Sequence, residues 1–543
     1  MKNSILIIEL LFFALVTFSC GHTKQQNKIP VAPEEYRRPE NFQPFNYQYS
    51  LEDLKANFSE EMMRNASKQY QKVTKVNDKG KWKPTTESID NHQTPEWFKD
   101  AKFGMFIDWG LWSVAGWAPK KEEGAMYPDW YELRLGIDST FIKYHNKNWG
   151  KDFKRDDFIP LFTANNYNPD KLTNIAKEAG MKYIIPFSKH HGGFCLWSSS
   201  FTQRDVVDMV PGRDLIEPLV ESCKEQDLKF GFYFSVEEWE YPLIDIEGNL
   251  VNRKWGGETE SYSKDLEKKA SGKIAVKNYS KNYLVPQATE FIDLYDPDIV
   301  WYDGDWGTNV DSLKTYEISA YFYNNAEGRK EVAVNDRYGG HEGEKWQRSK
   351  RGDFFTNEYG DMEEEAIQTI HAWEECRGIS QSFGYNWQDT DDNVISSKEF
   401  IDMFVDIIAH GGNLLLIVNL DGQGALPKIQ EDRLKDIGTW LNVNGEGIYA
   451  TRPFKQQVEG NVSYTQSKDN IYVYVIIKEW PGDEIYLKEI NAENGSKIEM
   501  LGYKEPFEWV NTAKGLNIKF PERLQNENTR PCKYAWVLKV KKS

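Results

Sequence analysis

Cysteine is scarce in this chain, with five residues among 543. Cys20 follows an apolar N-terminal stretch. The other four, Cys195, Cys223, Cys376 and Cys532, are scattered without the spacing of a metal site. We therefore expect these four to be buried thiols rather than a disulfide framework.

Positive charge is also in deficit, because 67 lysines and arginines face 84 aspartates and glutamates, for a net charge of −17. Nucleic acids select positive surfaces, so this balance argues against a nucleic-acid partner. After the N-terminus, no segment is long and apolar enough to span a bilayer. Repeats and low-complexity tracts are absent. Aromatic residues are abundant, at 14% with 19 tryptophans; they suit sugar rings but also ordinary cores, so composition alone only hints at carbohydrate.

The N-terminus has the pattern of an export signal. Lys2 precedes an apolar run over residues 5–18, which ends at Ser19, Cys20 and Gly21. A cysteine after a small residue resembles the cleavage site of bacterial lipoproteins, where Cys20 would become the lipidated N-terminus. We expect residues 1–20 to be a lipoprotein-type signal peptide. The mature protein is then an exported lipoprotein of a Gram-negative bacterium, in the periplasm or at the outer membrane.

Residues 21–93 form a polar extension rich in lysine, asparagine, glutamine and glutamate. Its first part is typical of a tether, and residues 59–73 fit a helix with a loose apolar stripe. Ordered structure is predicted to begin near Thr94, where Thr94-Pro95-Glu96-Trp97 matches a capped helix start.

From residue 94 to about residue 452, strand-like runs alternate with amphipathic helical stretches, which is typical of βα units around a parallel sheet. The eight candidate strands are residues 102–109, 181–189, 228–235, 298–303, 331–337, 353–359, 378–385 and 413–419. Helical patterns cover residues 169–179, 214–225 and 286–295, and residues 244–281 are a predicted surface insertion. The predicted fold class is α/β, with a (β/α)₈-like barrel over residues 94–452.

Beyond Pro453 the pattern changes to short alternating runs. They cover residues 462–466, 471–477, 484–487, 516–520 and 535–540. Short runs separated by turn residues are typical of antiparallel sheets. We therefore predict a small C-terminal antiparallel β-sandwich over residues 453–543.

The stretch from Pro297 to Trp306 is the one around which the barrel is organised. An apolar run ends there at Asp303 and is followed at once by Gly304. These boundaries predict a buried strand, and barrel enzymes place catalysis at the carboxyl ends of their strands. Taken alone, however, Asp303 fits a turn or a helix cap better than a catalytic role.

The other predicted strands also end in polar or aromatic residues. These are Asp108, the pair His190 and His191, Tyr233 with Ser235, Asn335 to Arg337, and Glu358, while Trp373 to Glu375 precede the seventh strand. Such residues in one barrel mouth suit a glycoside hydrolase, in which one carboxylate attacks and another protonates the leaving group.

The histidine pair has two other interpretations. His190 and His191 could ligate zinc with nearby acids, or they could form a hydrogen-bonded pair in the core. Adjacent residues on a strand point to opposite sides, so both rarely bind one ion. We predict no metal and no cofactor.

Several short sequence blocks follow one another along the chain. Two of the blocks are Lys189-His-His-Gly-Gly-Phe and Val300-Trp-Tyr-Asp-Gly. The others are residues 97–107, 109–114, 231–235, 334–337, 356–359, 373–376, 382–386, 411–416 and 444–449. Each block is weak alone, and the ordered set is strong. With these blocks in this order, the chain resembles glycoside hydrolase family 29, the retaining α-L-fucosidases.

The resemblance implies an exo-acting α-L-fucosidase that works by double displacement. Asp303 matches the family's nucleophile and Glu358 its general acid/base, with Glu374 and Glu375 as fallbacks for the second role. The positions that match the sugar pocket are Trp130, His190, His191, Tyr233, Trp301 and Arg337. The implied partner is a fucosylated glycan.

Two departures from the family pattern concern the sugar rim. Asp108 stands where the family has a histidine that touches the sugar, and Asp129 stands where it has a glutamate. An apolar pocket rejects an added hydroxyl only weakly, so one alternative is an α-L-galactosidase acting on L-galactosylated, and even sulfated, algal galactan. A second alternative is a catalytically silent sugar-binding lipoprotein, which would be marked by the loss of Asp303 or Glu358.

Overall fold

The computed structural model describes residues 29–45, 58–121, 124–262, 271–340, 352–359 and 372–543. The predicted signal peptide and its Cys20 lie outside the described residues. Within these ranges, no helix combines the length and apolar character needed to cross a bilayer. Cys195, Cys223 and Cys376 are buried free thiols, as predicted, and Cys532 is a partly exposed free thiol.

Eight strands form one parallel sheet in the order β8-β7-β3-β2-β1-β11-β10-β9. A bridge between Asn335 and Phe354 links the two end strands, so the sheet nearly closes on itself. The strands are β1 (Phe103–Asp108), β2 (Tyr183–Lys189), β3 (Lys229–Ser235), β7 (Ile299–Asp303), β8 (Ala333–Val334), β9 (Phe354–Glu358), β10 (Ala372–Gly378) and β11 (Asn413–Asn419). The predicted barrel is confirmed.

The barrel strands are buried on both faces because helices cover the outside and side chains fill the inside. Every residue of β1 and of β11 is buried, as expected for parallel strands inside a helical layer. Gly104 on β1 leaves room for a neighbour, since a Cβ there would lie 2.2 Å from the ring of Tyr183 on β2. The missing side chain at Gly104 thus leaves the space that the Tyr183 ring occupies.

The helical layer follows the predicted pattern, and its ends carry the expected signals. Its main members are α9 (Pro169–Glu178), α10 (Glu217–Glu225), α12 (Val285–Tyr295), α14 (Thr315–Ala326), α15 (Ser397–Ala409) and α16 (Lys428–Asn444). Asn168 caps α9 by accepting a hydrogen bond from the backbone of Lys171. At the end of α12, Asp296 has a left-handed conformation, and Pro297 then starts the turn into β7.

The start of β7 is fixed by a carboxylate. Asp298 accepts hydrogen bonds from the backbone of Phe230 and from the Lys229 amine, each at 3.2 Å, on the neighbouring strand β3. The register pairs Ser235 with Asp303. The two strands therefore end together at the barrel mouth, which sets the depth of Asp303.

The seventh barrel strand differs from the prediction. Residues 378–385 were predicted as this strand, but β10 is Ala372–Gly378 and includes Glu374 and Glu375. Buried glutamates are rare in barrel strands unless they are paired. Here Glu374 accepts hydrogen bonds from Tyr183 and Trp301, which satisfies the buried carboxyl group in a way that spacing does not reveal.

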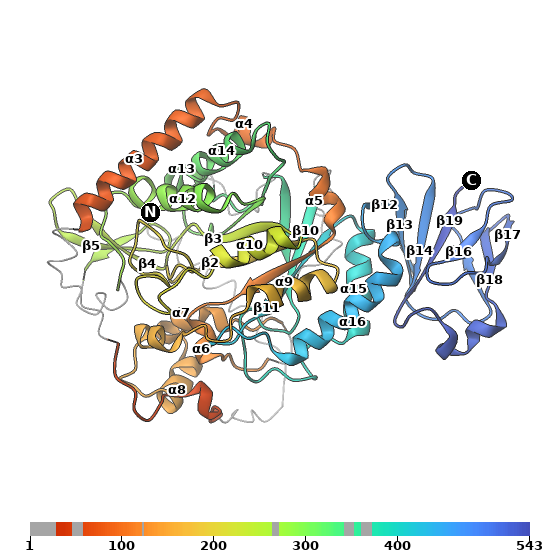
Figure 1. Ribbon diagram of the computed structural model, residues 1–543, viewed down its shortest axis with the longest axis horizontal. Helices are drawn as coiled ribbons and strands as arrows, with labels where there is room; N and C mark the ends of the chain where they lie inside the picture. The colour runs from red at the N-terminus through yellow and green to blue at the C-terminus, as the bar shows by residue number, and fades with distance from the viewer. Residues whose placement is uncertain (1–28, 46–57, 122–123, 263–270, 341–351, 360–371) are drawn as a thin grey trace, which may run out of the picture.

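Ordered structure begins well before Thr94, contrary to the prediction. Helix α3 (Phe58–Lys79) lies against α12 and α14, and Met62, Ala66 and Val73 are buried there. Figure 1 shows this helix lying across the outer helices of the barrel. The predicted apolar stripe was too loose to show that residues 58–79 belong to the barrel wall.

The insertion after β3 forms a three-stranded antiparallel sheet of β4 (Glu240–Ile244), β5 (Leu250–Lys254) and β6 (Thr259–Ser261). The insertion does not lie wholly on the surface, because Trp255, between β5 and β6, contacts other aromatic rings at the barrel mouth. That ring lies 5.7 Å from Trp130 and 5.2 Å from Trp306, centroid to centroid. The insertion therefore contributes to the wall around the barrel mouth.

The C-terminal part contains two antiparallel sheets around a core of its own. The larger consists of β12 (Thr451–Glu459), β13 (Val462–Ser467), β14 (Tyr472–Ile477), β19 (Trp536–Lys541) and β16 (Ile498–Met500). The smaller consists of β15 (Glu484–Leu487), β18 (Gly515–Lys519) and β17 (Glu508–Thr512). The predicted C-terminal β domain is confirmed.

Two outer helices of the barrel hold this domain. Lys478, which follows β14, donates to the two carboxylate oxygens of Asp406 on α15 at 2.7 Å and 2.8 Å. Trp440 of α16 donates to the backbone carbonyl of Ala535 at 2.8 Å. In Figure 1, α15 and α16 stand between the barrel and the C-terminal sheets. The domain therefore lies beside the barrel wall.

Candidate active site

Asp303 is the last residue of β7, a strand of five buried residues. The next residue, Gly304, has φ +81°, and a Cβ there would lie 2.9 Å from the Ser235 hydroxyl and 3.1 Å from the His191 ring. Only glycine tolerates both the backbone angle and the close approach. The sequence pair Asp303-Gly304 therefore turns the chain sharply and leaves the carboxylate at the mouth.

Both oxygens of the Asp303 carboxylate accept hydrogen bonds, one from strand β3 and one from the segment that follows β8. The Tyr233 hydroxyl donates to Oδ2 at 2.7 Å, and Arg337 Nη1 donates to Oδ1 at 2.7 Å. Burial opposes ionisation, but the charge of Arg337 outweighs it and lowers the pKa of Asp303. Asp303 is therefore a fixed, ionised carboxylate, which suits a nucleophile.

Glu358 ends β9 on the adjoining side of the mouth. Arg337 Nη2 contacts Glu358 Oε1, and Arg337 Nε donates to Thr356 at 2.9 Å. One guanidinium therefore contacts both carboxylates and fixes their relative positions. The Glu358 side chain is 25% exposed and that of Asp303 is 11% exposed, so Glu358 lies nearer the opening.

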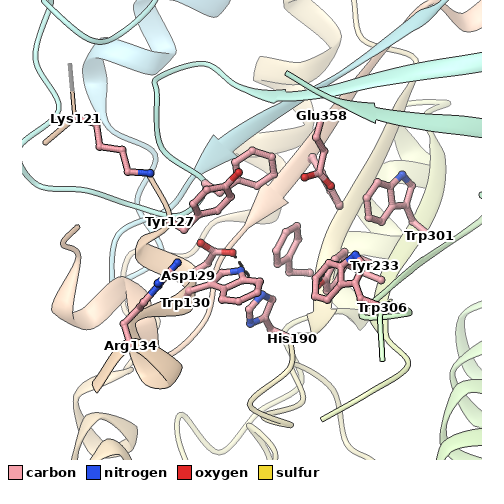
Figure 2. A pocket seen from close by; sticks show the side chains of 14 residues that line it. Lys121, Tyr127, Asp129, Trp130, Arg134, His190, Tyr233, Trp301, Trp306 and Glu358 are labelled. Carbon is pink, nitrogen blue, oxygen red and sulfur yellow. Dashed lines mark hydrogen bonds and ion pairs between the residues drawn. The ribbon is translucent and has the colours of Figure 1, made fainter. Parts of the chain in front are cut away.

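A cavity of about 660 Å³ connects the two carboxylates to solvent. Seven of the predicted site residues line this cavity: Asp129, Trp130, His190, Tyr233, Trp301, Asp303 and Glu358. Figure 2 shows Trp301 and Tyr233 on one side and Asp129 and Tyr127 on the other. A mostly aromatic cavity with a few charged groups suits one sugar ring.

The two histidines differ in position. His190 lines the cavity with its Nε2 3.5 Å from Asp129 Oδ2, and its ring lies against Trp112. His191 lies behind the cavity wall, where its Nδ1 is 2.6 Å from the Ser235 hydroxyl and its Nε2 is 3.6 Å from Asp303. Burial lowers the pKa of His190 to about 4 and that of His191 to about 3, so both are neutral near pH 7.

Asp108 does not reach the cavity, although it was predicted to bind the sugar. It is fully buried, and its Oδ1 accepts a hydrogen bond from Trp112 Nε1 at 2.9 Å. Burial, together with the charge of Asp129, raises the pKa of Asp108 well above its usual range. Burial likewise raises the pKa of Asp129, with Asp303 and Glu358 adding to the effect. This pair of acids therefore holds protons more tightly than exposed acids do.

The fallback acids lie away from the cavity. Glu374 lies beneath Trp301, whose Nε1 donates to it at 3.0 Å, and Glu375 accepts from Asn357 at 2.8 Å. Neither lines the cavity, and both are buried. Of the acids predicted for the second role, only Glu358 shares the cavity with Asp303.

Sequence reasoning missed part of the cavity wall. The additional lining residues are Phe106, Lys121, Tyr127, Arg134, Phe187, Trp306 and Phe383. Trp306 could have been found, since it follows Asp303 by three residues in the same turn. Lys121 and Arg134 carry no motif, because they lie in the long connection between β1 and β2.

Across the described ranges, no group of three or more histidine, cysteine, aspartate or glutamate side chains could hold an ion. The two histidines instead contact separate groups, Asp129 and Ser235.

The comparisons with known proteins agree with this geometry. The family model described as α-L-fucosidase matches residues 69–446, and that of the α-L-fucosidase C-terminal domain matches residues 455–541. The chain is 30% identical over 470 residues to an α-L-fucosidase of Branchiostoma floridae, covering 85% of this chain and 96% of that one. It is 31% identical over 464 residues to human plasma α-L-fucosidase, covering 84% and 91%.

Solved structures extend the similarity. The Thermotoga maritima α-fucosidase in complex with fucose superposes with a TM-score of 0.67 at 31% identity, covering 84% of this chain and all of that chain. The same enzyme with a mechanism-based inhibitor gives a TM-score of 0.68, covering 84% and 99%.

Proposed function

Because this chain belongs to the α-L-fucosidase family, we propose that it hydrolyses terminal α-L-fucosides with Asp303 as nucleophile and Glu358 as general acid/base. It is a retaining, exo-acting glycoside hydrolase. The observation that carries the residue assignment is the Arg337 guanidinium, which contacts both carboxylates at the mouth of one cavity.

The first step is attack of Asp303 Oδ on the anomeric carbon. Arg337 and Tyr233 hold the carboxylate ionised and oriented, while Glu358 gives its proton to the departing glycosidic oxygen. The C–O bond to the leaving group breaks as the bond to Asp303 forms.

The second step releases fucose. Glu358, now ionised, takes a proton from water, and the oxygen of that water displaces Asp303 from the anomeric carbon. Two inversions give net retention. Retaining enzymes hold their carboxyl groups about 5–5.5 Å apart, against about 6.5–9.5 Å in inverting enzymes. Contacts from one guanidinium to both acids favour the shorter separation.

The neutral histidine at the cavity wall supports binding of sugar hydroxyls. His190 has a pKa lowered to about 4 by burial, so near pH 7 it offers one N–H donor and one acceptor. Aromatic faces of Trp301 and Tyr233 provide apolar surface beside it.

Neither alternative activity gains support from the structure. The α-L-galactosidase alternative rested on Asp108 and Asp129 at the sugar rim. Of these two, Asp129 lines the cavity and Asp108 does not, and the curated relatives described above are α-L-fucosidases. The silent sugar-binding alternative required a missing carboxylate, and both Asp303 and Glu358 line the cavity.

Purified protein should release aryl leaving groups from an α-L-fucoside much faster than from the matching α-L-galactoside. For the second carboxylate, Glu358→Ala should lose most activity on poor leaving groups. On an aryl fucoside whose leaving group needs no proton, azide should restore turnover of this variant, because azide attacks the glycosyl–enzyme in place of water without needing a base. Equal rates on both sugars would contradict the substrate. Failure of azide to rescue Glu358→Ala would contradict the acid/base assignment.

We also propose that the enzyme is exported and anchored by lipid at Cys20, in the periplasm or at the outer membrane. The support is the apolar run over residues 5–18 followed by Ser19-Cys20. Radiolabelled palmitate fed to expressing cells should label the wild-type protein but not Cys20→Ala. Label in both, or in neither, would contradict the anchor.

A further inference from the structure

Two cations line the mouth of the catalytic cavity. Lys121 lies in the connection after β1, and Arg134 belongs to α7 (Tyr131–Ile137). Figure 2 shows both on the side of Tyr127 and Asp129, across the cavity from Trp301 and Trp306. The mechanism proposed above uses neither of them.

Neither cation has a carboxylate partner within 4.0 Å among the described residues. Lys121 Nζ donates to the carbonyl of Ala125 at 2.6 Å and lies 5.6 Å from the Tyr127 ring centre. Arg134 lies 5.9 Å from the Trp130 ring centre. These contacts position the two side chains, and no carboxylate among the described residues forms an ion pair with either of them.

Within the described ranges, this lack of carboxylate partners contrasts with the excess of acidic residues in a chain of net charge −17. Arginines with a structural role nearby do have acidic partners, such as Arg155 with Glu132 at 3.4 Å and Arg204 with Asp156 at 2.9 Å. Lys121 and Arg134 therefore differ from the cations that hold the fold together.

The two cations also repel each other. Partial burial, together with the charge of Arg134, lowers the pKa of Lys121. A cavity wall with two like charges is relieved by an anion placed between or beside them. The site is thus complementary to a negatively charged group.

The position of the cations decides which part of the substrate they meet. The fucose ring is neutral and must lie against Asp303, the more buried carboxylate, while Glu358 protonates the leaving oxygen nearer the opening. Whatever is bonded to that oxygen extends toward the mouth. The cations therefore face the leaving group.

We propose that Lys121 and Arg134 form an anion-binding subsite for the leaving group, which selects fucosides whose adjoining unit carries a carboxylate or a sulfate ester. This inference rests on the proposed function, since it assigns the leaving-group side from the roles of Asp303 and Glu358. The two anions share the chemistry that the subsite recognises.

Three matched disaccharides test the subsite: α-L-fucose linked to galactose, to galacturonate, and to galactose 6-sulfate. We expect at least one anionic disaccharide to have a kcat/KM about fivefold above that of the neutral one, the scale of two partly exposed ion pairs. Raising salt from about 0.05 M to about 0.5 M should reduce that ratio toward one. The better anionic substrate identifies the group as a carboxylate or a sulfate.

Variants assign the preference to the two side chains. Lys121→Met and Arg134→Gln should each lower the ratio of anionic to neutral kcat/KM, and the double variant should abolish the preference. Lys120→Met is the matched control, because Lys120 is adjacent in sequence and does not line the cavity; its ratio should equal that of the wild type.

Two results would overturn the subsite. One is that the wild-type enzyme, at low salt, has the same kcat/KM for the anionic and the neutral disaccharides. The other is an equal fall of the ratio in Lys120→Met, which would indicate a general field rather than a site. Both are distinct from failure of the proposed function, in which the neutral disaccharide itself would not be hydrolysed.

Discussion

Asp303 at the barrel mouth and Glu374 in the layer beneath it are both buried carboxyl groups that accept hydrogen bonds from aromatic side chains. Tyr233 donates to Asp303, while Tyr183 and Trp301 donate to Glu374. Yet the pKa of Asp303 is lowered, whereas burial raises that of Glu374 to about 7. The aromatic hydrogen bonds are alike, so they do not account for the opposite directions.

The difference lies in the cation. Arg337 donates directly to Asp303, whereas the hydrogen bonds that Glu374 accepts from described residues come from Tyr183 and Trp301, which are uncharged. Desolvation disfavours the charged form of both acids, and only a close positive charge reverses that effect. The comparison shows that the mouth is built to keep a carboxylate charged, and the layer beneath is built to support Trp301.

The largest expected effect comes from removing the charged acid at the mouth. Asp303→Ala should lower kcat by roughly 10⁴-fold, since loss of a nucleophile removes the covalent route. Asp305→Ala, two residues along the chain and outside the cavity lining, is the matched control. Initial rates on an aryl α-L-fucoside measure both. Similar losses in the two variants would indicate disruption of the turn instead.

Replacing Arg337, the cation that contacts the acid at the mouth, should have the next largest effect. Arg337→Lys keeps the charge but cannot contact Asp303 and Glu358 together. The pKa of Asp303 should rise, and because Asp303 must be ionised to attack, the acid limb of kcat/KM should move upward by about 1 pH unit or more. Arg377→Lys is the control: Arg377 contacts the Tyr359 ring, and its replacement should not shift the acid limb of kcat/KM. An unmoved limb in Arg337→Lys would refute the role of the cation.

A matched pair of hydroxyl deletions compares the mouth with the layer beneath. Tyr233→Phe removes the donor to Asp303 and should lower kcat/KM about tenfold or more, because hydrogen bonds to charged groups contribute about 1.5–3 kcal/mol. Tyr183→Phe removes the donor to Glu374 and should change kcat/KM far less. Steady-state kinetics of both decide this. A larger loss in Tyr183→Phe would reverse the comparison.

The smallest effect on activity is expected for Glu374→Gln, at about threefold or less, because the amide is close in shape to the protonated acid. Stability should respond instead. The native pKa of Glu374 is raised from 4.5 to about 7, so the folded state binds its proton more tightly, and stability falls as pH rises through this window. The variant should lose that part of the slope, as measured by thermal unfolding at about pH 5 and about pH 7.5. A loss of most activity in Glu374→Gln would contradict this prediction and would indicate that Glu374 is a catalytic acid.

Much of this arrangement follows from the sequence. The barrel, the C-terminal sheets and the convergence of Asp303, Glu358 and Arg337 were predicted from strand ends and ordered blocks. Strand ends are informative because parallel strands in a barrel all point their carboxyl ends to one face. Residues separated by 34 or 21 positions, such as Arg337 and its two acids, therefore meet.

The predictions that were wrong or incomplete depended on long-range contacts, which no local sequence pattern contains. The charged segment around Glu374 looked unlike a strand, because its hydrogen-bond donors come from β2 and β7. Asp108 was placed at the sugar rim, but the ring of Trp112 binds it below the cavity. Lys121 and Arg134 come from a long connection whose path the sequence does not fix.

The most direct test of the central claim is to trap the covalent intermediate. A 2-deoxy-2-fluoro-α-L-fucosyl fluoride forms the glycosyl–enzyme bond but slows its hydrolysis, and mass spectrometry of the digested protein locates the label. We predict one fucosyl group on the peptide that contains Asp303. A label on Glu358, on Glu374, or on no carboxylate at all would contradict the account.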